Sequence, residues 1–222
     1  NQLQVLLVAD RDAEKAAAAL DVYVGSRQDP DNRQGLAHFL EHMIFLGTKN
    51  YPEAGSYQQF ISANGGSHNA YTSFEHTNYY FDIDNEALPQ ALDRFADFFV
   101  APLFTAQYVE REVNAVESEY RARFKDEQRR VLDATQQIFN PRHPYNKFTV
   151  GSLGTLLNDS AEAVREDMMA FYQRYYSANR MSLVVVGDYS LEQLAALVEH
   201  RFTKVKNNAQ PVEAITEPLF AS

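Results

Sequence analysis

Residues 35–43 read Gly-Leu-Ala-His-Phe-Leu-Glu-His-Met, and the fold of the whole chain is organised around them. Because residues four apart lie one turn apart on the same face of an α-helix, the imidazoles of His38 and His42 can reach one ion. Glu41 lies near enough to that face to touch a water held on the ion. The other positions are largely apolar, which is typical of a helix buried in a core. A buried polar cluster on such a helix requires a partner, and the stretch therefore predicts a metal site.

A histidine pair at helical spacing also arises by chance, which is the alternative explanation of this pattern. The order His-x-x-Glu-His is the reverse of the commoner His-Glu-x-x-His and is by itself only a hypothesis about metal-assisted hydrolysis. The rest of the chain must therefore supply the context.

Composition narrows the function classes. The 222 residues include 15 Phe and 13 Tyr, enough for a sizeable core, and the net charge of −10 argues against a nucleic-acid partner. Without cysteine, a zinc site must use histidine and carboxylate ligands, the set that is typical of catalytic sites. No apolar run approaches the roughly 20 residues that span a bilayer, so no membrane partner is expected. No signal peptide is visible, and because the chain starts at Asn1 without methionine, it resembles a piece of a longer protein.

Alternating or apolar β-prone runs predict the strands. Residues 16–24 are ambiguous because four alanines favour a helix, whereas the alternation that follows favours a strand. We predict a strand there that pairs with the first one. The expected strands are Leu3–Val8, Ala16–Val24, Ser67–Ser73, Thr77–Ile83 and Met181–Val186.

Apolar stripes of helical period, with capping residues at their starts, predict the helices. The expected helices are the one that carries His38 and runs to about Leu46, a short one capped by Ser56 through Ala63, one within Asn85–Val100, a long charged one from Thr105 to Phe139, one opened by Asp159 with Glu162 and running to about Tyr176, and one opened by Ser190 with Gln193 and running to about Phe202.

This mixed order of hairpins and helical crossovers predicts an α+β fold, with a mixed, largely antiparallel sheet and helices packed mainly on one face. Residues 1–204 are expected to form one domain. Residues 205–222 lose periodicity and are expected to be a linker toward a following domain.

A catalytic zinc takes three protein ligands, so the histidine pair needs one more. The long charged helix offers several glutamates, most of which are expected on its solvated face, and spacing alone does not choose among them. The candidates are Glu110, Glu112, Glu117 and Glu119.

Several motifs in the same order resemble the pitrilysin/insulin-degrading enzyme (insulinase) family of inverzincin zinc metallopeptidases. They are His38-Phe39-Leu40-Glu41-His42 with the following Met43–Lys49, Gly65–Ala70, His76–Phe81, Arg111–Glu119 and Tyr175–Asn179. The resemblance runs through essentially the whole chain, with residues 1–204 as the N-terminal zinc-bearing domain.

The resemblance implies Zn²⁺ as the cofactor, with His38, His42 and Glu119 as its ligands. It also implies that Glu41 is the general base and that Glu112 is a supporting catalytic carboxylate. Glu117 is expected to be a surface residue.

The family binds extended peptides at a sheet edge beside the zinc, and similarity assigns Asn69, Ala70 and Tyr71 to that edge. An ordinary hairpin is the alternative for these residues. His68 and His76 are expected to be surface or turn residues, and His143 and His200 carry no signal.

The function implied is that of a zinc-dependent endopeptidase acting on peptides or small unfolded proteins, with peptide substrates and the remaining domains of the same polypeptide as partners. The isolated domain is expected to need those domains for full activity. The alternative is a non-catalytic structural or peptide-binding half of a pitrilysin-like assembly. The sequence leaves the compartment open, and the periplasm of Gram-negative bacteria is the location that relatives suggest.

Overall fold

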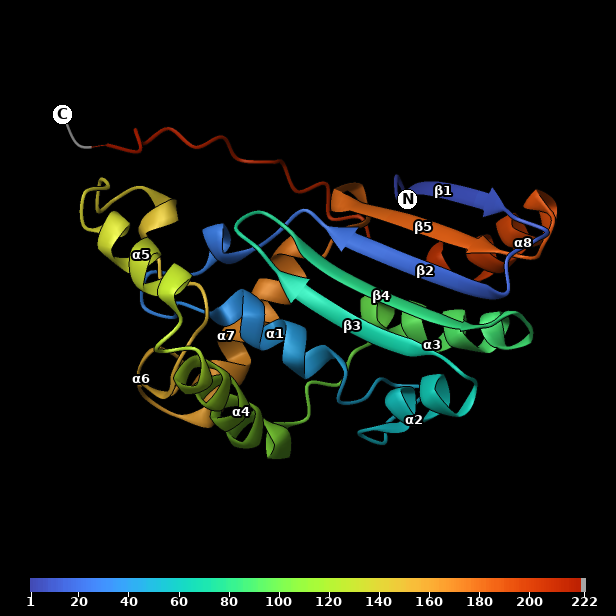
Figure 1. Ribbon diagram of the computed structural model, residues 1–222, viewed down its shortest axis with the longest axis horizontal. Helices are drawn as coiled ribbons and strands as arrows, with labels where there is room; N and C mark the ends of the chain where they lie inside the picture. The colour runs from blue at the N-terminus through green and yellow to red at the C-terminus, as the bar shows by residue number, and fades with distance from the viewer. Residues whose placement is uncertain (221–222) are drawn as a thin grey trace.

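The computed structural model describes residues 1–220, and five strands in them form one twisted sheet (Figure 1). The strands in sheet order are β1 (Gln4–Ala9), β5 (Met181–Gly187), β2 (Lys15–Val22), β4 (Thr77–Asp84) and β3 (Ser67–Thr72). Only β1 and β5 are parallel neighbours, and the other three pairs are antiparallel. The predicted pairing of the first two strands is wrong, because β5 inserts between β1 and β2.

Apart from α5 (Glu127–Gln136), the α-helices gather mainly on one face of this sheet, as Figure 1 shows, and the predicted α+β class is confirmed. They are α1 (Leu36–Ile44), α2 (Ser56–Ala63), α3 (Leu88–Val100), α4 (Val109–Ala122), α6 (Leu153–Leu156), α7 (Ala161–Tyr175) and α8 (Leu191–Phe202).

The core lies between the sheet and these helices. Alternate residues of β2 and β4 are buried, as expected for strands that have one covered face, and they include Leu20, Tyr79 and Phe81. Rings of α3 pack against them: Phe95 meets Phe81 at 5.2 Å and Phe99 meets Tyr79 at 5.6 Å between ring centroids. Each such buried aromatic side chain contributes on the order of 2 kcal/mol by leaving water. The helix that carries the histidines, α1, packs against β3 and β4 of the same sheet.

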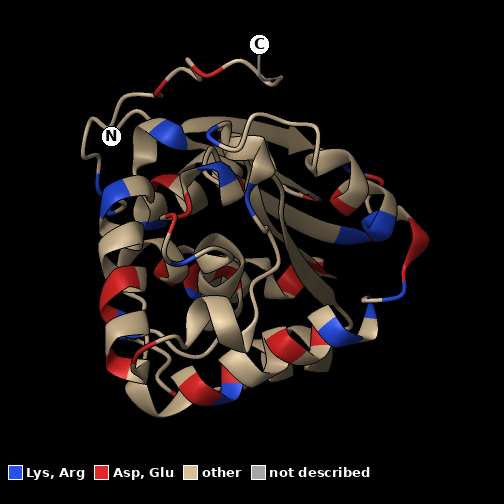
Figure 2. Ribbon diagram, turned by 90° about the vertical axis from the view of Figure 1, so that its left-hand side faces the viewer, with Lys and Arg blue, Asp and Glu red and all other residues tan. Residues whose placement is uncertain are grey.

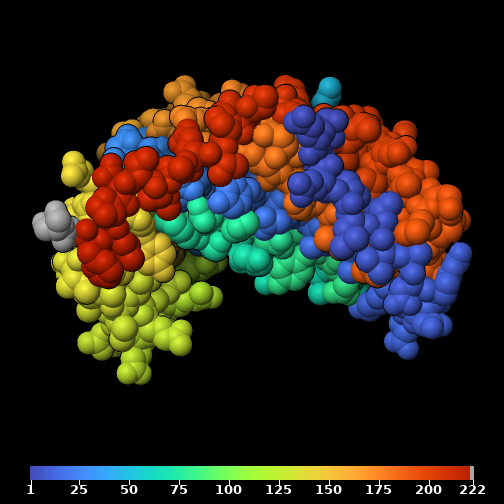
Figure 3. All heavy atoms as spheres, turned by 90° about the horizontal axis from the view of Figure 1, so that it is seen from above, coloured from blue at the N-terminus to red at the C-terminus, as the bar shows by residue number. Residues whose placement is uncertain are grey.

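The long helix predicted from Thr105 to Phe139 is wrong, because the chain breaks after Ala122. Asp126 takes an extended conformation and its carboxylate accepts a hydrogen bond from the Arg129 N–H at 3.1 Å, which starts α5 as a separate helix. A short 3₁₀ turn, Ala106–Tyr108, precedes α4. No residue of α5 is fully buried, so this helix projects from one end of the molecule (Figure 3).

Helix caps differ from the expectation at two places. Ser160, and not Asp159, caps α7 by accepting from the Ala163 N–H at 3.2 Å. Gly55, and not Ser56, is the N-cap of α2. The capping box of Ser190 and Gln193 is confirmed. The short helix α6 is not among the helices expected from the sequence.

Residues 205–220 contain no helix or strand and run back along the surface toward α5 (Figure 1). Backbone hydrogen bonds attach this segment at both ends, from Ala178 N–H to the Lys206 carbonyl at 2.8 Å and from Asn140 N–H to the Leu219 carbonyl at 2.8 Å. Its role as a linker stays a prediction. Within residues 1–220, no helix is long and apolar enough to cross a bilayer.

Candidate metal and catalytic site

Helix α1 is fixed at its start by a buried carboxylate. Asp29 accepts hydrogen bonds from the N–H groups of Gly35 and Ala37, both at 2.8 Å, which satisfies donors of the first helical turn. Gly35 has φ +91°, and a Cβ there would lie 2.2 Å from the Cα of Gly151. Only glycine allows this close approach. The contact brings the Val150 loop against the first turn of α1.

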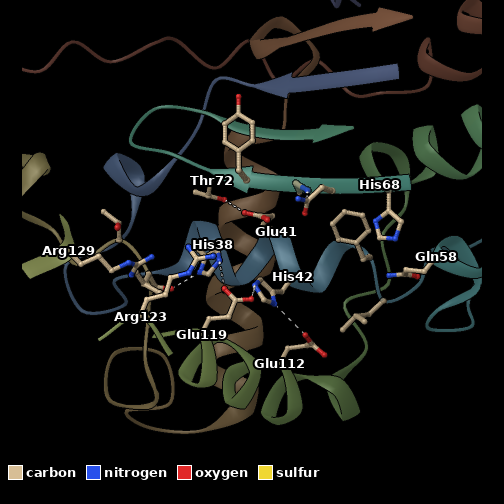
Figure 4. A pocket seen from close by; sticks show the side chains of 17 residues that line it. His38, Glu41, His42, Gln58, His68, Thr72, Glu112, Glu119, Arg123 and Arg129 are labelled. Carbon is tan, nitrogen blue, oxygen red and sulfur yellow. Dashed lines mark hydrogen bonds and ion pairs between the residues drawn. The ribbon is translucent and has the colours of Figure 1, made fainter. Parts of the chain in front are cut away.

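Three side chains from two helices converge in front of α1 (Figure 4). His38 Nε2 lies 3.6 Å from Glu119 Oε2, and His42 Nε2 lies 3.5 Å from Glu119 Oε1. One possible ligand atom from each of the three residues lies within 4.8 Å of the others. The structure thus brings together the three residues that the resemblance implied as metal ligands.

Each imidazole is oriented by a group on its far side. His38 Nδ1 donates to the Val150 carbonyl at 2.7 Å, so its Nε2 lone pair faces Glu119. His42 Nδ1 lies 3.6 Å from Glu112 Oε2, and Arg111 Nε lies 2.9 Å from the other oxygen of Glu112. Such outer contacts fix the ring orientation of metal-binding histidines.

Glu41 lies on the same helix and points to strand β3. Its Oε2 accepts a 2.6 Å hydrogen bond from the Thr72 hydroxyl, and its residue exposure is 8%. Burial raises the pKa of Glu41, although the hydrogen bond from Thr72 opposes this shift. A carboxyl with a raised pKa beside a candidate metal site is suited to proton transfer.

The pKa values of the groups around Glu41 are shifted in opposite directions. Burial and the adjacent His42 lower the pKa of His38. Burial also acts to lower the pKa of His42, but Glu112, Glu119 and Glu41 outweigh it and raise this pKa. Hydrogen bonding to His42 lowers the pKa of Glu112. The carboxylates therefore surround the pair with negative charge, which favours a cation between them.

A cavity of about 530 Å³ opens over these groups and follows the edge strand β3. Asn69, Ala70 and Tyr71, the predicted substrate-edge residues, all line it. Strand β3 pairs only with β4 among the strands of residues 1–220, so its outer edge is unpaired. Figure 3 shows the surface set back along these strands, between the projecting α5 end and the opposite end of the molecule.

Three other predicted positions can be compared with the structure. Glu117 is not a surface residue: its side chain is 12% exposed and accepts from the Leu153 N–H at 2.8 Å at the start of α6. His76 is a turn residue as expected, with Nδ1 2.7 Å from Asp21. His68 lies partly buried in the cavity wall against Phe45, at 5.6 Å between ring centroids.

The sequence reasoning missed five polar residues that line the same cavity. They are Gln58, Thr72, Arg123, Arg129 and Thr149. A threonine in a strand and arginines on a charged helix have no local signature, since only the packing of distant elements brings them to the site.

The chain is similar to proteins of one peptidase family. The family described as "Insulinase (Peptidase family M16)" matches residues 4–151, which contain every residue of the site. The insulin-degrading enzyme of Mus musculus is 46% identical over 99% of this chain. This chain belongs to the insulinase family of peptidases. The family consists of zinc metalloendopeptidases.

A second relative is also similar over nearly the whole chain. The A-factor-processing enzyme of Saccharomyces cerevisiae is 40% identical over 99% of this chain. The chain spans 22% of the length of each of these two relatives. A second family, described as "Peptidase M16 inactive domain", matches residues 163–221.

Two solved structures have a similar fold. A crystal structure of pitrilysin has a TM-score of 0.91 and 41% identity, and the match covers 98% of this chain and 23% of that one. A protease from Helicobacter pylori has a TM-score of 0.82 and 26% identity, and the match covers 99% of this chain and 52% of that one.

Proposed function

We propose that this chain is the zinc-bearing catalytic part of an endopeptidase that hydrolyses peptides or small unfolded proteins. The observation that carries the proposal is the convergence of His38, His42 and Glu119 next to the buried Glu41, in a cavity beside an open sheet edge.

The donor set fits zinc. Ligand atoms about 2.0–2.1 Å from a tetrahedral zinc lie roughly 3.3–3.4 Å from one another. Each imidazole approaches one oxygen of Glu119 at a distance close to this spacing, 3.6 Å to Oε2 from His38 and 3.5 Å to Oε1 from His42. One ligand atom from each of the three residues lies within 4.8 Å of the others. Two imidazoles and one carboxylate are also the ligands of a hydrolytic site that keeps one position open.

When bound, zinc would acidify a water and polarise the scissile carbonyl. In this proposal Glu41 accepts the proton of the attacking water and returns it to the leaving amine. The hydrogen bond from the Thr72 hydroxyl to Oε2 holds the Glu41 carboxylate in position. Glu112 holds His42 in the orientation that presents Nε2, and so acts through the imidazole.

The substrate is proposed to be an extended peptide that pairs with β3. The backbone groups at the outer edge of Asn69, Ala70 and Tyr71 supply main-chain hydrogen bonds of the kind used in strand addition. Tyr71 is 52% exposed and its side chain lines the cavity, so it can contact a substrate side chain.

Further domains of the same polypeptide are proposed to complete the enzyme, because the relatives are several times longer than this chain. A non-catalytic peptide-binding half is the second candidate, and the match of residues 163–221 to a family described as an inactive domain is the observation in its favour. The full set of His38, Glu41, His42 and Glu119 favours the catalytic part. A periplasmic location stays a prediction, and one relative is named for the peroxisome.

Metal analysis together with peptide hydrolysis tests the proposal. We expect about one zinc per chain, which His42→Ala removes, and cleavage of unstructured peptides by the full-length protein. Glu41→Gln should keep the zinc but reduce hydrolysis by at least about 100-fold, the usual contribution of a general base. A folded wild-type protein that binds no zinc, or full activity in Glu41→Gln, would overturn it.

A further inference from the structure

A second cavity, of about 790 Å³, adjoins the metal site between α4, α5 and the loop at residues 147–150. Four residues line both cavities and form the boundary between them. They are Arg123, Arg129, Thr149 and Val150. Because Val150 also holds His38, the second cavity begins directly beside the candidate metal ligands.

The walls of this cavity are mainly basic, with five Lys or Arg side chains and one carboxylate, Asp133, although the chain as a whole carries a net charge of −10. Four cationic side chains line it that have no carboxylate within 4.0 Å in residues 1–220: Arg123, Lys125, Arg129 and Arg130. The neighbouring Arg121 differs, since its Nε lies 2.6 Å from Glu117. Figure 2 shows the end of the molecule that carries this region, where basic and acidic positions are interspersed along the helices.

Two of these cations, Arg123 and Arg129, lie beside the candidate metal ligands. Figure 4 shows Arg123 and Arg129 at the His38 end of the site, opposite Gln58 and His68. Arg129 is half-buried, so its charge is less screened by water than that of a fully exposed side chain. Behind the cations, the cavity is lined by apolar and aromatic side chains: Tyr120, Phe124, Leu132 and Phe148.

The path along β3 leads into this cavity. A peptide that pairs with β3 extends past Thr72, whose hydroxyl contacts Glu41. Beyond Thr72 it leaves the strand near His38. Its next residues then lie beside Arg123 and Arg129. Unpaired guanidinium groups in a cavity attract carboxylates strongly, and their planar geometry allows two parallel hydrogen bonds to one carboxylate.

We infer that Arg123 and Arg129 form a specificity site that accepts an acidic side chain of the peptide, one or two residues from the scissile bond on the His38 side. This inference rests on the proposed peptidase function and adds to it a substrate class, peptides with Asp or Glu at that position. An aspartate or glutamate of the peptide supplies the carboxylate partner that Arg123 and Arg129 lack within residues 1–220.

The test uses the full-length protein and matched peptides that carry Glu, Gln or Lys at each of three positions on either side of the cleaved bond. We expect a preference for Glu of about fivefold to tenfold in kcat/KM at one position on one side, as for a partly desolvated charge pair. Arg123→Gln and Arg129→Gln should each reduce the preference to less than about threefold, and Arg129→Glu should reverse it in favour of Lys. Arg121→Gln, on the same segment but paired with Glu117, is the matched control and should retain the preference.

Binding separates this inference from the peptidase proposal. In a Glu41→Gln background, the Kd ratio of the Gln and Glu peptides should show the same preference and the same loss in Arg129→Gln. If the wild-type protein cleaves no peptide but this binding ratio holds, the peptidase proposal fails and recognition by the cavity stands. Equal cleavage of Glu and Gln peptides at every position, or an equal loss in Arg121→Gln, would overturn the inference.

Discussion

The hydroxyl of Thr72 donates a 2.6 Å hydrogen bond to Oε2 of Glu41 and thereby connects the edge strand β3 to helix α1. Thr77 lies behind it, with its hydroxyl 3.5 Å from that of Thr72 and 2.9 Å from the Val24 carbonyl. The strand proposed to bind substrate therefore also positions the proposed general base. A displacement of β3 would change both functions together.

Replacing Thr72 by valine tests this connection. Valine keeps the β-branched shape and removes the donor, so Glu41 loses its hydrogen bond and its pKa should rise further. We expect kcat/KM of the full-length enzyme to fall by about tenfold, mainly in kcat, and the acidic limb of its pH profile to move upward. The zinc content should not change.

Thr72→Ser is the control for this experiment. Serine restores the hydroxyl without the methyl group and should recover most of the activity and the original pH profile. An equal loss in Thr72→Ser and Thr72→Val, with no movement of the pH profile in either, would assign Thr72 a packing role only.

Local sequence information was enough to predict most of the elements of this fold. The periodicity of α1, α3 and α8 and the alternation of β3 and β4 depend on near neighbours, and these elements appear where expected. The position of β5 between β1 and β2 depends on residues more than 150 positions apart in the chain, so no local pattern reveals it. The break before α5 was missed because Asp126 can lie inside a charged helix or cap a new one.

The candidate site was also predictable only where its residues are close together in the sequence. His38, Glu41 and His42 belong to one helix, and their spacing alone predicts a shared face. Spacing did not separate Glu119 from its neighbours on the long helix. The resemblance assigned it, and the packing of α4 against α1 brings it to the two histidines. Glu117, two residues away, turns to α6 instead.

Removing the charge of Glu112 is expected to weaken zinc binding. Glu112 lies 3.6 Å from His42 Nδ1, and outer partners of this kind contribute about 10- to 100-fold to metal affinity. Glu112→Gln should therefore raise the Kd for zinc by about that factor, measured by competition with a chelator of known affinity. Glu110→Gln, an exposed position on the same helix, is the control and should leave the Kd unchanged.

The raised pKa of Asp29 predicts that the stability of the protein depends on pH. Burial raises the pKa of Asp29 to about 7, although the N–H groups of Ala37 and Gly35 oppose this shift. The native state therefore holds a proton that the unfolded chain, with an ordinary pKa of 3.8, releases at lower pH. Its contribution to stability is full below about pH 4, decreases up to about pH 7 and is constant above that value.

Urea unfolding of the wild type and Asp29→Asn at several pH values measures this effect. Asparagine does not titrate, so subtracting its free energy of unfolding cancels the other ionisable groups. The difference, wild type minus variant, should fall between about pH 4 and 7 by at most about 1.4 kcal/mol per pH unit. A difference that is constant or rises with pH would show that Asp29 is ionised throughout.

Arg33 is expected to be the most important single cation for stability. It is 2% exposed, and its guanidinium lies 2.9 Å from both Asp159 and Asp167 and 2.7 Å from the carbonyl of Leu156. It thereby ties α6 and α7 to the turn that precedes α1. Arg33→Met fills similar space but leaves a buried carbonyl and two carboxylates without their partner, so we expect a loss of about 2–4 kcal/mol in the free energy of unfolding.

Two further variants distinguish the contribution of the buried hydrogen bonds of Arg33 to stability from the contribution of its charge. Arg33→Lys keeps the charge but cannot reach the three acceptors with one planar group, and should recover less than half of the loss. Arg174→Met removes an exposed pair with Glu213 at 3.0 Å and should cost less than about 1 kcal/mol. Urea unfolding at pH 7 measures all three. Equal losses in Arg33→Met and Arg174→Met would mean that burial adds nothing to the ion pairs of Arg33.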